Sequence, residues 1–466
     1  MPRIIVAATP LHGHVTPLLS VAADLVRRGH DVAMLTGSRF AGRVRATGAR
    51  HVSLPPEADY DDRRMTAHFP ELATAAPGPE MDAVYARQVF ADCAPGQWRA
   101  LAALLETFPA GAVVADVLFL GTFPLVLGER RGPRPAVVGL GVVPVMAQSA
   151  DAPPYGLGLR PSGRETHLAL NAAARAAFAP VQEHCAKVFA ALGADLPGHL
   201  YDATVSVPDH YLQLTVPEFE YPRSDLPASF RFAGPLPPPA SAGFEPPDWW
   251  GELSGAAERG RPVVVVTQGT LANADLGRLV VPALRGLAGE EVLVVAATAR
   301  PDGPAEVRAA IVPADGPAGT PGATGLAEGP AGTPGATGSA EGPAGAPGIP
   351  GNAIVAGYVP FDRLLPYADV LVTNGGYGGV HAAIHHGVPL VVAGTTEDKA
   401  DIAARVSWSG AGIDLRTGRP EPEDVRRAVM TVLGDERHRR AVARLRAAAR
   451  RYDPFETIAR IVNQNM

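Results

Sequence analysis

Residues 369–393 read DVLVTNGGYGGVHAAIHHGVPLVVA. Two short apolar runs, residues 369–373 and 389–393, stand on either side of a segment long enough for a helix of about three turns. Short β-branched runs alternating with helix-length segments are typical of parallel sheets with helical crossovers. Gly387, followed by a proline, marks the end of the helix. The stretch therefore predicts a strand–helix–strand unit, the repeating element of an α/β fold.

The loop between the first strand and the helix is rich in glycine. Four of the five residues 375–379 are glycine, which lets a ligand approach the backbone closely. Because the following helix directs free N–H groups at the loop, the pattern indicates an anion site, most simply for a phosphate. His381 stands where a dinucleotide fingerprint has its third glycine, so that motif is not matched. A glycine-rich turn that only packs helix against strand is the alternative.

The same alternation of strands and helices recurs along the chain. In the first half, strands are expected at residues 3–8, 31–35, 51–54, 112–115 and 136–140. In the second half, further strands are expected at residues 262–267, 291–296 and 352–356. The first helix is expected to begin with Thr16 as N-cap and Pro17 at the first helical position, and to close at Gly29. This arrangement predicts two doubly wound α/β domains.

Composition shifts divide the chain of 466 residues. We expect a first domain over residues 1–233, a proline-rich linker over 234–260, a second domain over 261–450 and a C-terminal helix over 451–466. Within the second domain, residues 314–352 repeat a glycine- and proline-rich unit of thirteen residues with glycine at collagen-like spacing. Because the repeat offers almost no apolar side chain to bury, it is predicted to be a disordered surface insertion.

The overall composition excludes several classes of protein. A net charge of −6 lacks the basic excess of nucleic-acid-binding proteins. Two cysteines cannot form a disulfide framework or a four-thiolate zinc site. The N-terminus does not resemble a signal peptide, and the chain has no apolar run of about 18 residues that would span a membrane. These features predict a cytoplasmic protein with neither nucleic-acid nor membrane partners.

Four motifs together resemble those of a known family. They are HGHVTP (12–17), GYVP (357–360), TNGGYGG (373–379) with GVPL (387–390), and TEDKAD (396–401). In this order and spacing they resemble family 1 of the nucleotide-sugar-dependent glycosyltransferases, the group that glycosylates macrolides, flavonoids and other natural products. The resemblance implies the GT-B fold, in which two Rossmann-like domains face each other across a cleft. It also implies an N-terminal acceptor-binding domain and a C-terminal nucleotide-sugar-binding domain.

The resemblance assigns catalytic roles to two residues. A histidine three residues before a proline deprotonates the acceptor in this family, and that position is His14. An imidazole suits this role because its ordinary pKa lies near neutral pH. His12 is the rival candidate. Asp116, at the carboxyl end of a predicted strand, corresponds to the family's carboxylate that orients the histidine.

The resemblance also implies a set of donor contacts. Tyr358 would stack on the nucleobase, next to Val359, and Asn374 replaces a histidine that contacts a phosphate in many relatives. The groups expected to hold the diphosphate are Thr270 and the backbone amides of Gly376, Tyr377, Gly378 and Gly379, and Gly375 belongs to the same donor site. The residues expected at the sugar are Glu397, Asp398 and Lys399. Lys399 departs from the family's usual glutamine, and we expect it to form an ion pair with Asp398 or Asp401. The alternative is that it pairs with a carboxylate on the sugar, so the identity of the sugar stays open.

We therefore expect an inverting glycosyltransferase that moves a sugar from a UDP- or TDP-sugar to a hydroxyl of a hydrophobic small molecule. No metal or other cofactor is expected, because helix N-termini can neutralise the diphosphate. Asp59 and Asp61 match a metal-binding Asp-x-Asp pattern but are interpreted as a solvated loop. The alternatives are a non-catalytic relative that binds a nucleotide sugar or a partner transferase, and a nucleotide-sugar epimerase. A monomer or a homodimer is expected.

Overall fold

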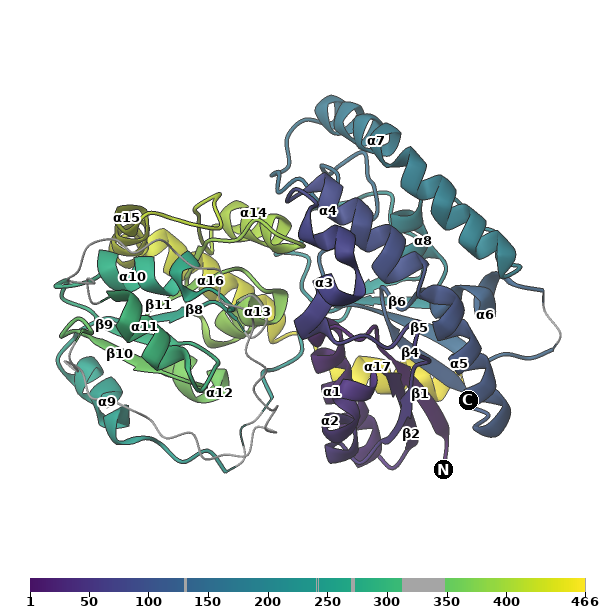
Figure 1. Cartoon of the computed structure of the whole chain (residues 1–466), viewed down its shortest axis with the longest axis horizontal. Helices are drawn as coiled ribbons and strands as arrows, with labels where there is room; N and C mark the ends of the chain where they lie inside the picture. Colours follow the sequence, from purple (N-terminus) through teal and green to yellow (C-terminus); the bar gives the residue numbers. More distant parts are fainter. Residues whose placement is uncertain (130–131, 240, 242, 270–272, 312–347, 466) are drawn as a thin grey trace.

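The computed structural model describes residues 1–129, 132–239, 241, 243–269, 273–311 and 348–465. These residues form two α/β domains that lie side by side, the first on the right and the second on the left in Figure 1. Residues 314–347 of the predicted insertion, and the predicted diphosphate contact Thr270, lie outside the described residues.

Each domain is built on one parallel sheet. The first sheet has seven strands in the order β3-β2-β1-β4-β5-β6-β7, and the second has six in the order β10-β9-β8-β11-β12-β13. The first set of strands is β1 (Arg3–Ala7), β2 (Asp31–Thr36), β3 (Arg50–Ser53), β4 (Ala112–Asp116), β5 (Ala136–Gly141), β6 (His210–Gln213) and β7 (Phe230–Phe232). The second set is β8 (Val263–Thr267), β9 (Leu293–Ala297), β10 (Ala353–Ala356), β11 (Val370–Thr373), β12 (Leu390–Val392) and β13 (Gly412–Asp414).

Helices cover both faces of each sheet (Figure 1). In the first domain these are α1 (His12–Arg27), α2 (Ala41–Ala46), α3 (Met65–His68), α4 (Pro79–Val84), α5 (Ala94–Thr107), α6 (Phe123–Leu127), α7 (Arg164–Ala191) and α8 (Leu200–Ser206). The later helices are α9 (Gly251–Glu258), α10 (Val280–Gly286), α11 (Gly303–Ile311), α12 (Phe361–Leu364), α13 (Tyr377–His386), α14 (Lys399–Ser409), α15 (Pro422–Gly434), α16 (Glu436–Ala449) and α17 (Pro454–Gln464). A π-helical turn, Tyr85–Ala91, continues α4.

The two doubly wound parallel sheets confirm the predicted fold class, and every predicted strand is present. Three further strands were not predicted: β6, β7 and β13. Each has only three or four residues and lacks a continuous apolar run, as HYLQ in β6 illustrates. These residues are strands because each segment pairs with a neighbouring strand of the sheet, and no local sequence pattern indicates that pairing.

The predicted start of the first helix is wrong. Helix α1 begins at His12 with Leu11 as N-cap, five residues before the predicted N-cap Thr16, and Pro17 lies inside it. The carbonyl of Leu11 accepts the N–H groups of His14 and Val15, at 2.9 and 2.8 Å, so the turn before Pro17 is already helical. As a result, His14 lies in the first turn of a helix and not in a flexible loop.

The C-terminal helix joins the two domains. Helix α17 lies against the first domain (Figure 1), where Ile458, Ile461 and Val462 are buried in its hydrophobic core. Within the predicted linker, α9 forms part of the second core through Leu253 and Ala256. The chain therefore crosses between the domains twice, and this double connection holds the carboxyl edges of the two sheets near one another.

Candidate active site

His14 and Asp116 form a buried pair at the carboxyl edge of the first sheet. Asp116 ends β4, and His14 Nδ1 lies 2.8 Å from Asp116 Oδ1. The carboxylate also accepts the backbone N–H groups of Thr9 at 2.6 Å and Leu118 at 2.8 Å. Nε2 of His14 has no hydrogen-bond partner within the described residues. Asp116 thus fixes the orientation of the ring and leaves Nε2 available to accept a proton.

His12, the rival candidate, has a different environment. Its Nδ1 lies 3.4 Å from Arg43 Nη1, and no carboxylate orients the ring within the part of the chain that the structure describes. Burial, together with Arg43 and Arg39, lowers the pKa of His12 to about 4. A histidine with this pKa is a weak base at neutral pH, so the geometry favours His14.

The glycine loop brings free backbone N–H groups to open space. Gly375 has φ +88°, and a Cβ there would stand 2.7 Å from a methyl group of Val392, so only glycine fits. A Cβ on Gly376 or Gly378 would meet nothing within 4 Å. Helix α13 begins at Tyr377, directly after Gly376, and the first N–H groups of a helix have no acceptor within that helix. The loop therefore has the structure of an anion site.

The side chains of Asn374 and Tyr377, two residues of the predicted donor site, make contacts within the protein. Asn374 Nδ2 donates to the carbonyl of Gln268 at 2.6 Å, which ties the loops after β8 and β11 together. Tyr377 accepts a hydrogen bond from Gln213 Nε2 at 3.0 Å and so reaches the first domain. In this structure, Tyr377 offers the cleft its backbone N–H rather than its hydroxyl.

The two predicted nucleobase residues differ sharply in exposure. Tyr358, after β10, is 69% exposed, whereas Val359 is 6% exposed and belongs to the second hydrophobic core. An exposed aromatic ring on a loop at the carboxyl edge of a sheet is available for stacking on a planar ligand. Val359 has only its backbone to offer such a ligand.

The predicted sugar loop is held by one ion pair and one contact between the domains. Lys399 Nζ forms an ion pair, but its partner is Glu397. The prediction that the partner is Asp398 or Asp401 is therefore wrong. Glu397 adopts a left-handed backbone conformation with φ +56°, which is uncommon for a residue with a side chain. A hydrogen bond from Tyr85 of the first domain also reaches Glu397. These contacts hold the strained conformation and place the loop against the first domain.

Electrostatic interactions connect the histidine with this loop. His14 lies close enough to Glu397 and Asp398 to lower the pKa of both carboxyl groups, although Lys399 has the larger effect on each. Burial outweighs these effects at Asp398 and raises its pKa to about 6. Burial, with Asp401 and Asp398 nearby, also raises the pKa of Asp82 on α4 to about 7. Asp398 and Asp82 therefore bind protons more readily than ordinary carboxyl groups do.

Further contacts between the domains were not foreseen from the sequence. Arg405 on α14 is 2% exposed and donates to Glu220 Oε1 from Nε at 2.8 Å and from Nη2 at 2.5 Å. His381 Nε2 lies 2.7 Å from Thr215 Oγ1. Each contact joins residues more than 160 positions apart, so no local pattern could have indicated it.

Asp59 and Asp61, interpreted as part of a solvated loop, are half-buried and form local contacts. Asp59 accepts the N–H of Ser38 at 2.9 Å, and Asp61 lies 3.4 Å from Arg39. Both carboxylates are thus structural. Among the described residues, no group of three or more His, Cys, Asp or Glu side chains is placed to hold a metal ion. No helix in the described part of the chain is long and apolar enough to cross a membrane.

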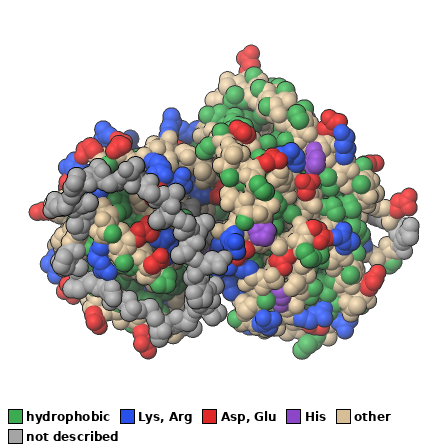
Figure 2. Space-filling view, in the orientation of Figure 1, with side chains coloured by type: hydrophobic (Ala, Val, Ile, Leu, Met, Phe, Trp, Pro, Cys, Tyr) green, Lys and Arg blue, Asp and Glu red, His purple; other side chains and the backbone are tan. Residues whose placement is uncertain are grey.

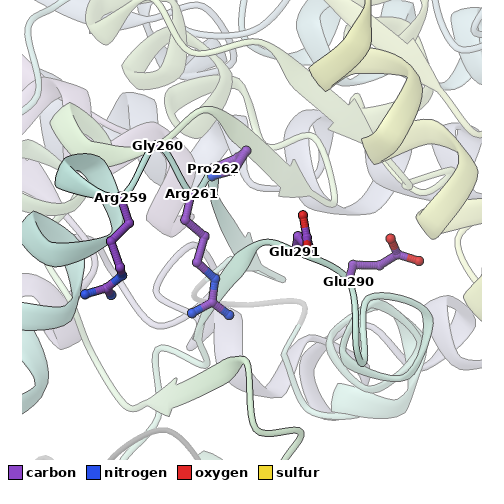
Figure 3. A pocket seen from close by; sticks show the side chains of 6 residues that line it. All are labelled: Arg259, Gly260, Arg261, Pro262, Glu290 and Glu291. Carbon is purple, nitrogen blue, oxygen red and sulfur yellow. The ribbon is translucent and has the colours of Figure 1, made fainter.

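A surface hollow lies elsewhere, between the ends of α9 and α10 (Figure 3). It is lined by Arg259, Gly260, Arg261, Pro262, Glu290 and Glu291. These residues precede β8 and β9, so the hollow lies at the amino edge of the second sheet. Ligands of open parallel sheets bind at the carboxyl edge, which is where His14 and the glycine loop lie.

Comparisons with known proteins agree with this geometry. Residues 339–463 match the family described as erythromycin biosynthesis protein CIII-like, C-terminal domain. The chain is 40% identical to 4'-demethylrebeccamycin synthase of Lentzea aerocolonigenes, covering 95% of this chain and 94% of that protein. It is 33% identical to UDP-glycosyltransferase 2 of Phaeomoniella chlamydospora, covering 98% and 94%.

Solved structures share the fold at lower identity. The glycosyltransferase of kitacinnamycin superposes with a TM-score of 0.68 at 20% identity, covering 100% of both chains. The calicheamicin glycosyltransferase gives 0.65 at 22% identity, covering 100% and 98%. The two facing parallel-sheet domains are the GT-B fold that these solved structures share. Because the two curated relatives are at least 33% identical over almost their whole length, the chain belongs to family 1, the natural-product glycosyltransferases, and is an enzyme.

Proposed function

We propose that this enzyme transfers a sugar, with inversion, from a UDP- or TDP-sugar to a hydroxyl of a hydrophobic natural-product aglycone. His14 would be the general base and Asp116 the residue that positions it. The pair of His14 Nδ1 with Asp116 Oδ1, at 2.8 Å, carries the proposal because it leaves Nε2 without a partner among the described residues, in a histidine near the sugar loop. Relatives named UDP-glycosyltransferase and UDP-glucosyltransferase favour UDP over TDP.

The mechanism proposed is a single displacement. Nε2 of His14 removes the acceptor's hydroxyl proton while the oxygen attacks the anomeric carbon, and the bond to the diphosphate breaks on the opposite face. Asp116 stabilises the imidazolium that forms. The N–H groups at the start of α13 stabilise the negative charge on the departing diphosphate, and no metal ion is required. Tyr358 would stack on the nucleobase, and Glu397 and Asp398 would contact the sugar.

The test is a transfer assay with UDP-glucose and TDP-glucose against a panel of polyketide and phenolic acceptors, read by mass spectrometry. The anomeric configuration of the product is then determined by NMR. We expect a β-glycoside from the α-linked donor, and no transfer by His14→Ala although that variant still binds the nucleotide. A retained configuration, or full activity of His14→Ala, would contradict the mechanism.

The same assay separates the two alternatives. An epimerase would release free nucleotide and an epimeric sugar without any acceptor. A non-catalytic relative would bind the nucleotide sugar and convert none of it under any condition. The orientation of His14 by a buried carboxylate favours the transferase, because binding alone does not need an oriented base.

A further inference from the structure

Arg43 on α2 is a cation without a carboxylate partner at the boundary between the domains. Its two hydrogen bonds go to neutral groups, His12 Nδ1 at 3.4 Å and Thr16 Oγ1 at 3.2 Å. Within the described residues no ion pair joins Arg43 to an acidic side chain, whereas Arg39 nearby pairs with Asp61 and Asp62. A partly buried guanidinium in this state has spare donors for an anion.

The position of Arg43 points to the donor rather than to bulk solvent. Its guanidinium lies close enough to Tyr358, in the second domain, for the two side chains to interact electrostatically. Both hydrogen-bond partners of Arg43 lie on α1, the helix whose first turn carries His14. Arg43 therefore lies beside the exposed ring expected at the nucleobase and against the first turns of α1, on the face that carries His12 and Thr16. In a nucleotide sugar the diphosphate is joined directly to the nucleoside, so a cation next to the nucleobase position is near the diphosphate as well.

The start of α1, next to Arg43, has room for such a ligand. Helices α1 and α13 contact one another across the domain boundary, and the first turn of each lies at the carboxyl edge of its own sheet. Figure 2 shows Lys and Arg side chains along the boundary between the domains on that face. A Cβ on Gly13 would meet nothing within 4 Å, so α1, like the glycine loop, borders open space. An anion held here would contact both domains.

We propose that Arg43 is the contact that the acceptor domain makes with the diphosphate of the bound donor. The inference rests on the proposed function and adds to it a positioning residue on the opposite side of the ligand from α13. A guanidinium can donate two parallel hydrogen bonds to phosphate oxygens, which orients the diphosphate as well as neutralising it. Because negative charge grows on the diphosphate as the sugar leaves, Arg43 also favours the departure of this group.

The experiment measures the affinities of uridine, UMP and UDP, and of the corresponding thymidine series, by calorimetry. Wild type is compared with Arg43→Gln, with Arg43→Lys, and with Arg45→Gln, which removes an exposed arginine from the same helix. We expect Arg43→Gln to weaken diphosphate binding about tenfold to a hundredfold, in line with the loss of charged hydrogen bonds, and to leave nucleoside binding unchanged. Arg43→Lys should recover part of the affinity, and Arg45→Gln should behave as wild type.

Each other outcome overturns a specific statement. Equal weakening of nucleoside and diphosphate would show that Arg43 shapes the pocket without contacting phosphate. Unchanged UDP and TDP affinity in a folded Arg43→Gln protein would remove Arg43 from the donor site while the proposed function stands. If the wild type binds no member of either series, the proposed function fails and the inference fails with it.

Discussion

Exchanging Asp116 for asparagine tests the proposed base more sharply than removing the histidine. All three partners of the carboxylate are donors: His14 Nδ1 and the N–H of Leu118 at Oδ1, and the N–H of Thr9 at Oδ2. An asparagine has one oxygen, so its NH₂ group must face either His14 together with the N–H of Leu118, or the N–H of Thr9. If it faces His14, the ring changes tautomer and Nε2 carries the proton, which abolishes its function as a base.

The magnitude follows from the same contacts. Loss of the correct tautomer lowers turnover about 10⁴-fold where an aspartate orients a catalytic histidine, equivalent to about 5 kcal/mol in the barrier. If the NH₂ group instead faces the N–H of Thr9, a buried donor loses its partner at a cost of about 1–3 kcal/mol in stability. We therefore expect Asp116→Asn to lower kcat by about three to four orders of magnitude with a moderate loss of folding stability.

The control is Asp62→Asn. The Asp62 carboxylate is equally buried, accepts the N–H of His12 at 2.6 Å and pairs with Arg39, but it does not touch His14. Transfer assays and thermal unfolding of both variants separate the two effects. Asp62→Asn should lose stability and keep kcat within a few-fold. If Asp116→Asn keeps more than about a tenth of wild-type kcat, the orientation of His14 does not govern the reaction and our reasoning is refuted.

Three further predictions concern the rest of the site. Tyr85→Phe removes a hydrogen bond to Glu397 in the sugar loop and should raise the donor KM about tenfold with kcat nearly unchanged. An unchanged KM in steady-state assays would show that this hydrogen bond does not contribute to donor binding. Burial lowers the pKa of His381 to about 4, so between pH 7 and pH 5 the unfolded chain binds a proton that the folded protein does not. The wild type therefore loses about 2 kcal/mol of unfolding free energy between pH 7 and pH 5 through this residue. The difference in unfolding free energy between wild type and His381→Gln, measured by chemical denaturation, should narrow by that amount, and a difference that stays constant contradicts the assignment. Gly375→Ala should destabilise the fold by about 2 kcal/mol, because its φ is +88° and its Cβ would overlap a neighbour, whereas Gly378→Ala should fold normally and weaken only UDP binding in calorimetry. Equal melting temperatures for the two variants would contradict this account of the glycine loop.

Local patterns were sufficient for the fold because strands such as β8 and β11 are buried on both faces and therefore consist of continuous apolar runs. They failed at β7 and β13, whose three residues each are placed by pairing with a neighbouring strand. They also misplaced the start of α1, because Pro17 is a strong signal for a first helical turn and the turn before it is held by the carbonyl of Leu11.

The candidate site was predictable in part for a related reason. His14, Asp116 and the glycine loop follow strands directly, so their meeting at the carboxyl edges follows from the fold. The partner of Lys399 was not predictable, since the choice between Glu397 and its neighbours depends on a left-handed backbone conformation. Arg43 was missed as well, because its significance lies in what surrounds it and not in any motif.

The contacts between the domains bear on how the site is assembled. Arg405 with Glu220, and His381 with Thr215, join α14 and α13 to the connection that follows β6. A variant that removes one partner of the Arg405–Glu220 pair would leave the other charge buried and unpaired, at a cost of about 3–5 kcal/mol. In this structure the two contacts set the position of helix α13 and the sugar loop relative to His14. Binding energy from the donor is then available for orienting the diphosphate and the sugar, instead of being consumed in bringing the two domains together.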